Sequence, residues 1–102
     1  MKIDEITMDD VVSFLRLEED EYKPVEIKAI MAAAKSFIIG HTHLPVESTD
    51  GQKTINDYDD FYIAYMVLCQ DMHENRTFTV DKDKINPTVE AILGMHSYNL
   101  VG

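Results

Sequence analysis

One helical segment decides the fold of this chain: residues 24–40, which read PVEIKAIMAAAKSFIIG. Pro24 suits a first helical turn, because its missing N–H costs nothing there. Gly40 favours the left-handed turn that ends a helix. The apolar side chains between them recur at steps of three and four residues, which is the spacing of one helix face; they are Ile27, Ile30, Met31, Ala34, Phe37 and Ile38. The segment therefore predicts an amphipathic helix of about 18 residues.

Shorter helices are expected near both ends of the chain. The N-terminal one begins at Thr7, whose hydroxyl can cap the first turn, and ends near residues 16–17. The C-terminal one opens with Asn86 as its cap and Pro87 at its first position. Between the central helices, residues 41–56 contain a cluster of turn formers and predict a loop.

A further helix is expected to start at Asn56 or Asp57, and it is apolar on nearly every side. A stripe of Phe61, Tyr65, Leu68 and Met72 forms one face, and the other faces carry Ile63, Met66, Val67 and Cys69. Such a helix is buried on more than one side. One side can face the core of the domain, and we expect the other to face a second subunit.

Together these segments predict a single all-α domain over residues 1–102. We expect about four helices: two long antiparallel central helices, with shorter helices at the N- and C-terminal sides. The length of 102 residues is that of one ordinary domain.

The charge balance excludes several classes of protein. Nineteen Asp and Glu residues stand against nine Lys and Arg residues, which gives a net charge of −10. An acidic domain lacks the positive charge that supplies most of the affinity for nucleic-acid phosphates. The same charge disfavours attachment to an anionic membrane.

No residue pattern indicates an enzyme or a metal protein. His41 and His43, with His73 and Glu74, could in principle bind zinc, but they match no zinc-binding motif. Cys69 lies in an apolar run, where a buried cysteine is usually inert. That run of nine apolar residues is too short to span a bilayer, which needs about twenty. With no signal peptide apparent, a reducing cytoplasm is the expected compartment.

Several short stretches, taken in order, form a pattern. A helix carrying residues 11–17 is followed by an acidic patch at 18–21, and the next helix contains three alanines at 32–34. The run His73-Glu74-Asn75-Arg76 follows the long apolar segment, and a helix opened by Pro87 comes last.

This order resembles the head–tail connector proteins, also called DNA-packaging or head-completion adaptors, of tailed bacteriophages and prophages. The similarity covers almost the whole chain, and its best signature is the run Glu74-Asn75-Arg76. His43 stands where that family often has glycine.

The resemblance implies a structural protein without cofactor, metal or catalysis. Members of the family assemble as rings of about twelve subunits below the portal, and DNA passes through the channel without specific binding. The implied partners are further copies of the chain, the portal protein and a tail-completion protein, with no membrane. The implied location is the cytoplasm of the bacterial host during assembly and then the virion neck.

Two sets of residues are candidates for this role. The acidic surface of the channel is expected at one of two groups, 18–21 or 57–60, because acidic walls repel the DNA backbone and keep the duplex mobile. These acidic candidates are Glu18, Glu19, Asp20, Glu21, Asp57, Asp59 and Asp60. The candidate subunit interface comprises Tyr62, Met66, Cys69, Arg76 and Phe78.

Two other functions stay open from the residues alone. A small acidic phage or prophage protein could mimic DNA and bind a basic host protein, and this class would stay monomeric or dimeric. A hydrolase that uses the histidines and carboxylates is the third hypothesis. Self-association separates the first two hypotheses, and loss of activity or stability on chelation would support the third.

Overall fold

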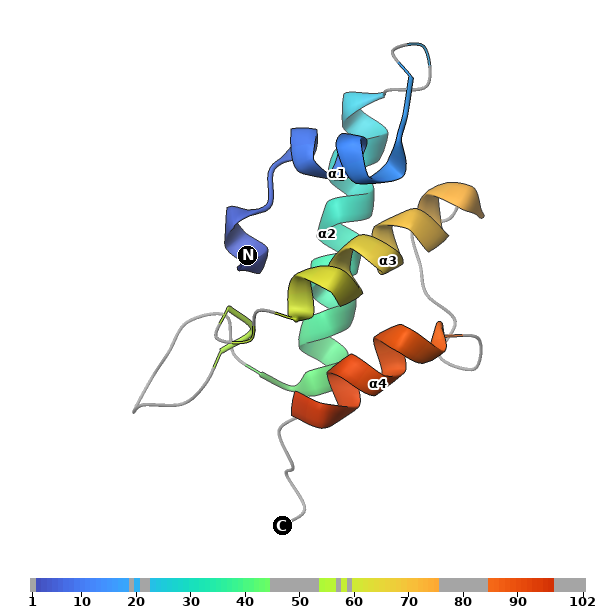
Figure 1. The fold of residues 1–102 in the computed structure, drawn as a ribbon. Coiled ribbons are helices and arrows are strands. Elements are labelled where there is room, and N and C mark those ends of the chain that lie inside the picture. Colours follow the sequence, from blue (N-terminus) through green and yellow to red (C-terminus); the bar gives the residue numbers. More distant parts are fainter. Residues whose placement is uncertain are drawn as a thin grey trace.

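The computed structural model describes residues 2–18, 20, 23–44, 54–56, 58, 60–75 and 85–96. Within these ranges every regular element is helical and no strand is present, which confirms the all-α prediction. The elements are a short 3₁₀ helix, η1 (Ile3–Glu5), and four α-helices: α1 (Met8–Leu15), α2 (Pro24–Thr42), α3 (Phe61–Glu74) and α4 (Pro87–His96) (Figure 1).

Helix α1 starts where the sequence predicts. Thr7 and Asp10 form a reciprocal capping box: the Asp10 N–H donates to Thr7 Oγ1 at 3.2 Å, and the Thr7 N–H donates to the Asp10 carboxylate at 2.9 Å. Arg16 follows the helix in the left-handed conformation, with φ 56°. A local cap and a left-handed stop are therefore enough to set both ends of this short helix.

Helix α2 begins at Pro24, as predicted, but does not end at Gly40. It continues to Thr42, and His43 takes the left-handed conformation after the helix, with φ 59°. The Thr42 hydroxyl is buried, donates to the Ile38 carbonyl at 2.7 Å and accepts the Leu44 N–H at 3.3 Å. The buried environment of Thr42 thus extends the helix past the glycine that the sequence marks as its end.

Helix α3 begins at Phe61, later than the predicted start at Asn56 or Asp57. Its C-terminal end is closed by Asn75, whose side-chain amide donates to the Asp71 carbonyl at 2.8 Å. The predicted stripe of this helix is buried, as are Ala64, Met66 and Cys69. The wide apolar surface predicted for this helix is therefore real.

Helix α4 has the predicted start. Asn86 accepts the Thr88 N–H through its side-chain oxygen at 2.8 Å, and Pro87 occupies the first helical position. Val89 and Leu93 are fully buried, and Ile92 is partly buried.

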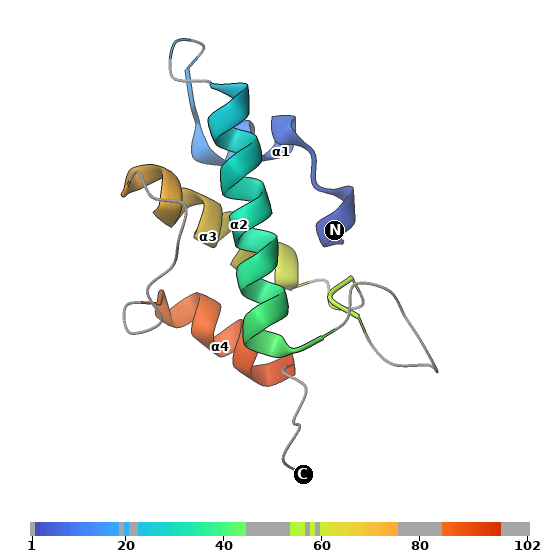
Figure 2. The same cartoon turned by 180° about the vertical axis from the view of Figure 1, so that it is seen from behind.

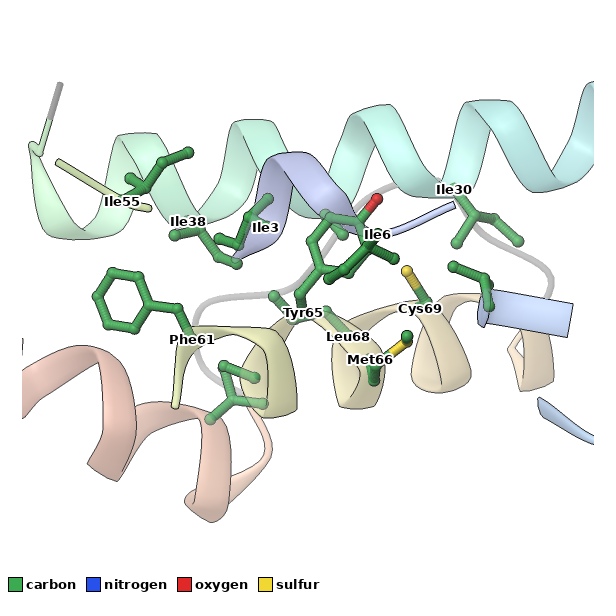
Figure 3. Close-up of a cluster of buried hydrophobic side chains, with 14 of the residues drawn as sticks. Ile3, Ile6, Ile30, Ile38, Ile55, Phe61, Tyr65, Met66, Leu68 and Cys69 are labelled. Carbon is green, nitrogen blue, oxygen red and sulfur yellow. The ribbon is translucent and has the colours of Figure 1, made fainter. Parts of the chain in front are cut away.

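Helices α3 and α4 lie side by side and run in opposite directions. Both cross α2 obliquely, which can be seen from the two opposite sides of the molecule in Figures 1 and 2. The predicted pair of long antiparallel central helices is not confirmed, because α3 has 14 residues against 19 in α2. The core fills the space between these layers. In Figure 3, Ile30 and Ile38 of α2 and Leu68 of α3 lie in one buried cluster.

The true end of α2 can be tested with two substitutions. Gly40→Ala is expected to raise the free energy of unfolding by about 0.5–1 kcal/mol, because alanine favours a helix interior over glycine and its Cβ meets no atom within 4 Å. His43→Gly is expected to raise it by up to about 1 kcal/mol, because glycine adopts the left-handed conformation without steric cost. Urea denaturation measures both changes.

If α2 ended at Gly40 instead, the alanine variant would be less stable than the parent chain. The sign of the change for Gly40→Ala therefore decides between the two helix ends.

Candidate functional site

Two buried side chains of α3 can lose a proton: the hydroxyl of Tyr65 and the thiol of Cys69. The Tyr65 hydroxyl donates to the Met31 carbonyl of α2 at 3.2 Å, so its polar end is satisfied although the ring is buried. Burial raises the pKa of the Cys69 thiol to about 12 and raises the pKa of Tyr65 above its usual value. A thiol that is protonated and fully buried is a poor nucleophile, so Cys69 has a packing role.

The structure describes three of the five predicted interface residues, and two of these three are buried. Tyr62 is half-buried, whereas Met66 and Cys69 expose only 4% and 0% of their surface. Arg76 and Phe78 lie outside the described residues. Helix α3 packs against η1, α1, α2 and α4, and this packing buries Met66 and Cys69 but leaves Ile63 exposed. Met66 and Cys69 therefore belong to the interior of the subunit and offer no surface to a partner.

The two acidic groups proposed as channel surface lie in different parts of the molecule. Glu18 and Asp20 are exposed in the segment between α1 and α2. Asp60 is partly buried and directly precedes α3, which begins toward the C-terminal half of α2 (Figure 1). The other four members, Glu19, Glu21, Asp57 and Asp59, lie outside the described residues.

A polar junction joins three distant segments, and the sequence did not indicate it. Asp4 of η1 accepts from the Lys35 ammonium of α2 at 2.9 Å and from the Asn56 side-chain amide at 2.6 Å. The Asp4 N–H in turn donates to Asn56 Oδ1 at 3.0 Å. The hydrogen bond from Lys35 holds the pKa of Asp4 below its usual value, against a smaller opposing effect of burial. Ile3 and Ile6, on either side of Asp4, are buried. These two isoleucines were the feature of the sequence that could have indicated that η1 packs on the core.

The histidines show no metal centre in the described part of the chain. No group of three or more His, Cys, Asp or Glu side chains there could hold a metal ion. His41 stacks on Phe37, with ring centroids 5.5 Å apart, and His43 follows α2 as its left-handed residue. His41 therefore packs against an aromatic ring, and His43 lies at the end of a helix.

Large apolar side chains are exposed at four described positions. Val25 exposes 82% and Met95 70% of their surface, and Phe14 and Ile63 expose 44% and 40%. Each of the four lies on a different helix, and single exposed apolar side chains are common on protein surfaces. Among the described helices, none combines the length and the apolar character needed to cross a membrane.

Comparison with known proteins gives no relative. No protein-family model matches the chain, and no curated protein or solved structure matches it.

The burial of Cys69 predicts its reactivity. This residue is the only cysteine of the chain. Under native conditions at pH 8, a thiol-specific reagent is expected to label it at least about a hundredfold more slowly than in the urea-unfolded chain, because labelling requires local opening. Absorbance of the released chromophore measures both rates. Labelling of the native chain at the rate of a free thiol would contradict the buried position.

The polar junction predicts a pH-dependent contribution to stability. Because the pKa of Asp4 is lowered in the folded state, the stabilisation is present above the unfolded pKa, near 3.8, and is lost as the pH falls through the folded value. Both side chains are partly exposed, so Lys35→Met is expected to cost about 0.2–1 kcal/mol at pH 7. The cost should shrink as the pH falls below 3.8 and the Asp4 carboxylate becomes protonated in the folded state.

Urea denaturation at pH 7 and pH 2.5 provides the measurement. Lys28→Met, at an exposed position of the same helix, is the matched control and should show little change at either pH. An equal cost of Lys35→Met at both pH values would show that the lysine stabilises the fold through its aliphatic stem and not through Asp4.

Proposed function

We propose that this chain is a head–tail connector subunit of a tailed bacteriophage or prophage, which assembles into a ring below the portal. The observation that carries the proposal is the order of the helices and their ends. A capped N-terminal helix precedes the acidic segment at 18–21, the alanines at 32–34 lie within the longest helix, and Glu74 and Asn75 end the third. A helix opened by Pro87 comes last. These are the segments on which the resemblance to connector proteins rests.

In this proposal the acidic charge serves the passage of DNA. A ring of about twelve subunits with net charge −10 each carries roughly 120 net negative charges. A wall of this sign repels phosphates, so the duplex passes without being held. Glu18 and Asp20 are exposed, and in this proposal they contribute to such a wall.

The proposed partners are other copies of the chain, the portal protein and a tail-completion protein. The subunit is made in the cytoplasm of the host and ends in the virion neck. Its role is structural, and the proposal includes no cofactor and no catalytic step.

A second function is favoured by the same high acidic content. Nineteen carboxylate side chains in 102 residues could imitate the phosphate charges of DNA and occupy the nucleic-acid site of a basic host protein. This alternative needs no ring, and its binding depends on attraction between opposite charges.

The salt dependence of association distinguishes the two functions, because added salt strengthens the association of a connector and weakens the binding of a DNA mimic to its partner. For a connector, raising the ionic strength from about 0.05 to 0.5 M is expected to favour ring formation, since salt screens the repulsion between acidic subunits. For a DNA mimic, the same change weakens binding to the basic partner. We expect the first result, with rings on the portal protein encoded in the same genome.

Mass measurement in solution and electron microscopy of the mixture with the portal provide the readouts. Rings whose mass is a multiple of the 11.7 kDa subunit support the connector. A chain that stays monomeric at every salt concentration and ignores the portal contradicts it.

A further inference from the structure

Positive charge in the described chain is concentrated on one helix. Residues 23–44, which contain α2, hold three lysines and one glutamate, whereas the other described residues hold ten acidic and only two basic side chains. Lys35 is paired with Asp4, but Lys23 and Lys28 are exposed. Helix α2 is therefore the part of the described molecule that an acidic surface would approach with least repulsion.

One side of α2 faces away from the rest of the subunit. We call it the α2 outer face; it comprises Val25, Lys28, Ala32, Ser36 and Gly40, which are all exposed. Their spacing of three and four residues places them along one line of the helix. None of them is acidic, and Glu26 lies off this line and is half-buried. Figure 2 shows α2 in front of the other helices.

The opposite side of the molecule is formed by α3 and α4. On α3, the Tyr65 hydroxyl bonds to the Met31 carbonyl of α2, so the side of α3 that carries Tyr65 faces α2. Ile63 and Glu74 lie on the other side of the same helix and are exposed. With Val67 and Gln70, which lie on the same line, they form the α3 outer face.

The α3 outer face is acidic at one end and apolar at the other. Glu74 accepts from the Gln70 side-chain amide at 3.3 Å, and the neighbouring Asp71 has a raised pKa because of burial and the charge of Glu74. The apolar end holds Ile63, and Met95 of the adjacent α4 is exposed as well. Glu74 and Ile63 here match Lys28 and Val25 of the α2 outer face in kind.

We propose that the α2 outer face of one subunit packs against the α3 outer face of the next copy, in a head-to-tail contact. This inference rests on the proposed ring and names the surfaces that would build it. A head-to-tail contact uses two different patches and closes into a ring when the rotation between subunits allows it. In a ring of about twelve, neighbours differ by about 30°, so the two patches must face nearly opposite directions. The outer faces of α2 and α3 do so.

The chemistry of the α2 outer face also favours this partner over a two-fold contact with itself. Pairing two α2 outer faces offers Lys28 no acidic partner, because none of the residues of that face is acidic. Pairing the α2 and α3 outer faces allows Lys28 to approach Glu74. The small side chains at Ala32, Ser36 and Gly40 allow a neighbouring helix to approach closely.

Two substitutions at exposed positions test the proposal, because each is designed to prevent one of the two outer faces from packing against a neighbouring subunit. Ala32→Arg places a long side chain on the α2 outer face, and Ile63→Arg does so on the α3 outer face. Ser13→Arg, at an exposed position of α1 outside both faces, is the matched control. Circular dichroism and urea denaturation establish that all three variants keep the fold.

The parent chain and Ser13→Arg are expected to form rings under the same conditions. Ala32→Arg alone and Ile63→Arg alone are expected to lose ring formation and to sediment as monomers. Each variant still has one intact face, and the two intact faces are different. An equimolar mixture of both variants should therefore form one-to-one dimers and nothing larger, as measured by analytical ultracentrifugation.

Other results would overturn the inference in distinguishable ways. Rings formed by both variants would show that other surfaces build the ring, while the connector proposal stands. Dimers formed by Ile63→Arg alone would indicate a two-fold contact between α2 outer faces. Self-association that is lost in both variants, without any binding to the portal, would support the two faces and contradict the connector. A parent chain that remains monomeric even on the portal overturns both proposals.

Discussion

The burial of α3 is the constraint on which the rest of the structure depends. This helix is apolar over most of its circumference, and apolar surface of that extent is stable in water only when other elements cover it. Helix α2 covers the side that carries Tyr65, and η1, α1 and α4 contribute the remaining cover. The short elements η1, α1 and α4 cover further sides of α3 and leave Ile63 and Glu74 exposed.

Three of the four helix starts could be predicted from the sequence, whereas the start of α3, the end of α2 and the long-range contacts could not. Thr7, Pro24, Asn86 and Pro87 act on the backbone within a few residues of themselves, and all four mark helix starts as predicted. The end of α2 escaped prediction because it depends on the burial of Thr42, which no local pattern reveals.

The candidate site shows the same division between local and distant effects. The apolar breadth of α3 was apparent from its sequence, but the elements that cover it come from distant segments. For that reason Met66 and Cys69 were assigned to an interface and lie instead in the interior. The Asp4–Asn56 pair joins residues 52 positions apart, and no sequence pattern around either residue indicates that the two are in contact. The exposed face of α2 could be identified only once the positions of α3 and α4 were known.

The junction of Asp4 with Asn56 also bears on the order in which the chain can fold during synthesis. Helices α1 and α2 pack on one another through contacts close in sequence, and such contacts form early. The segment with Ile3, Asp4 and Ile6 precedes α1 and α2, but Asn56 and α3, against which it also packs, are made after α2. Of the two side chains that bond to the Asp4 carboxylate, Lys35 is made first and Asn56 only later, so η1 completes its docking late.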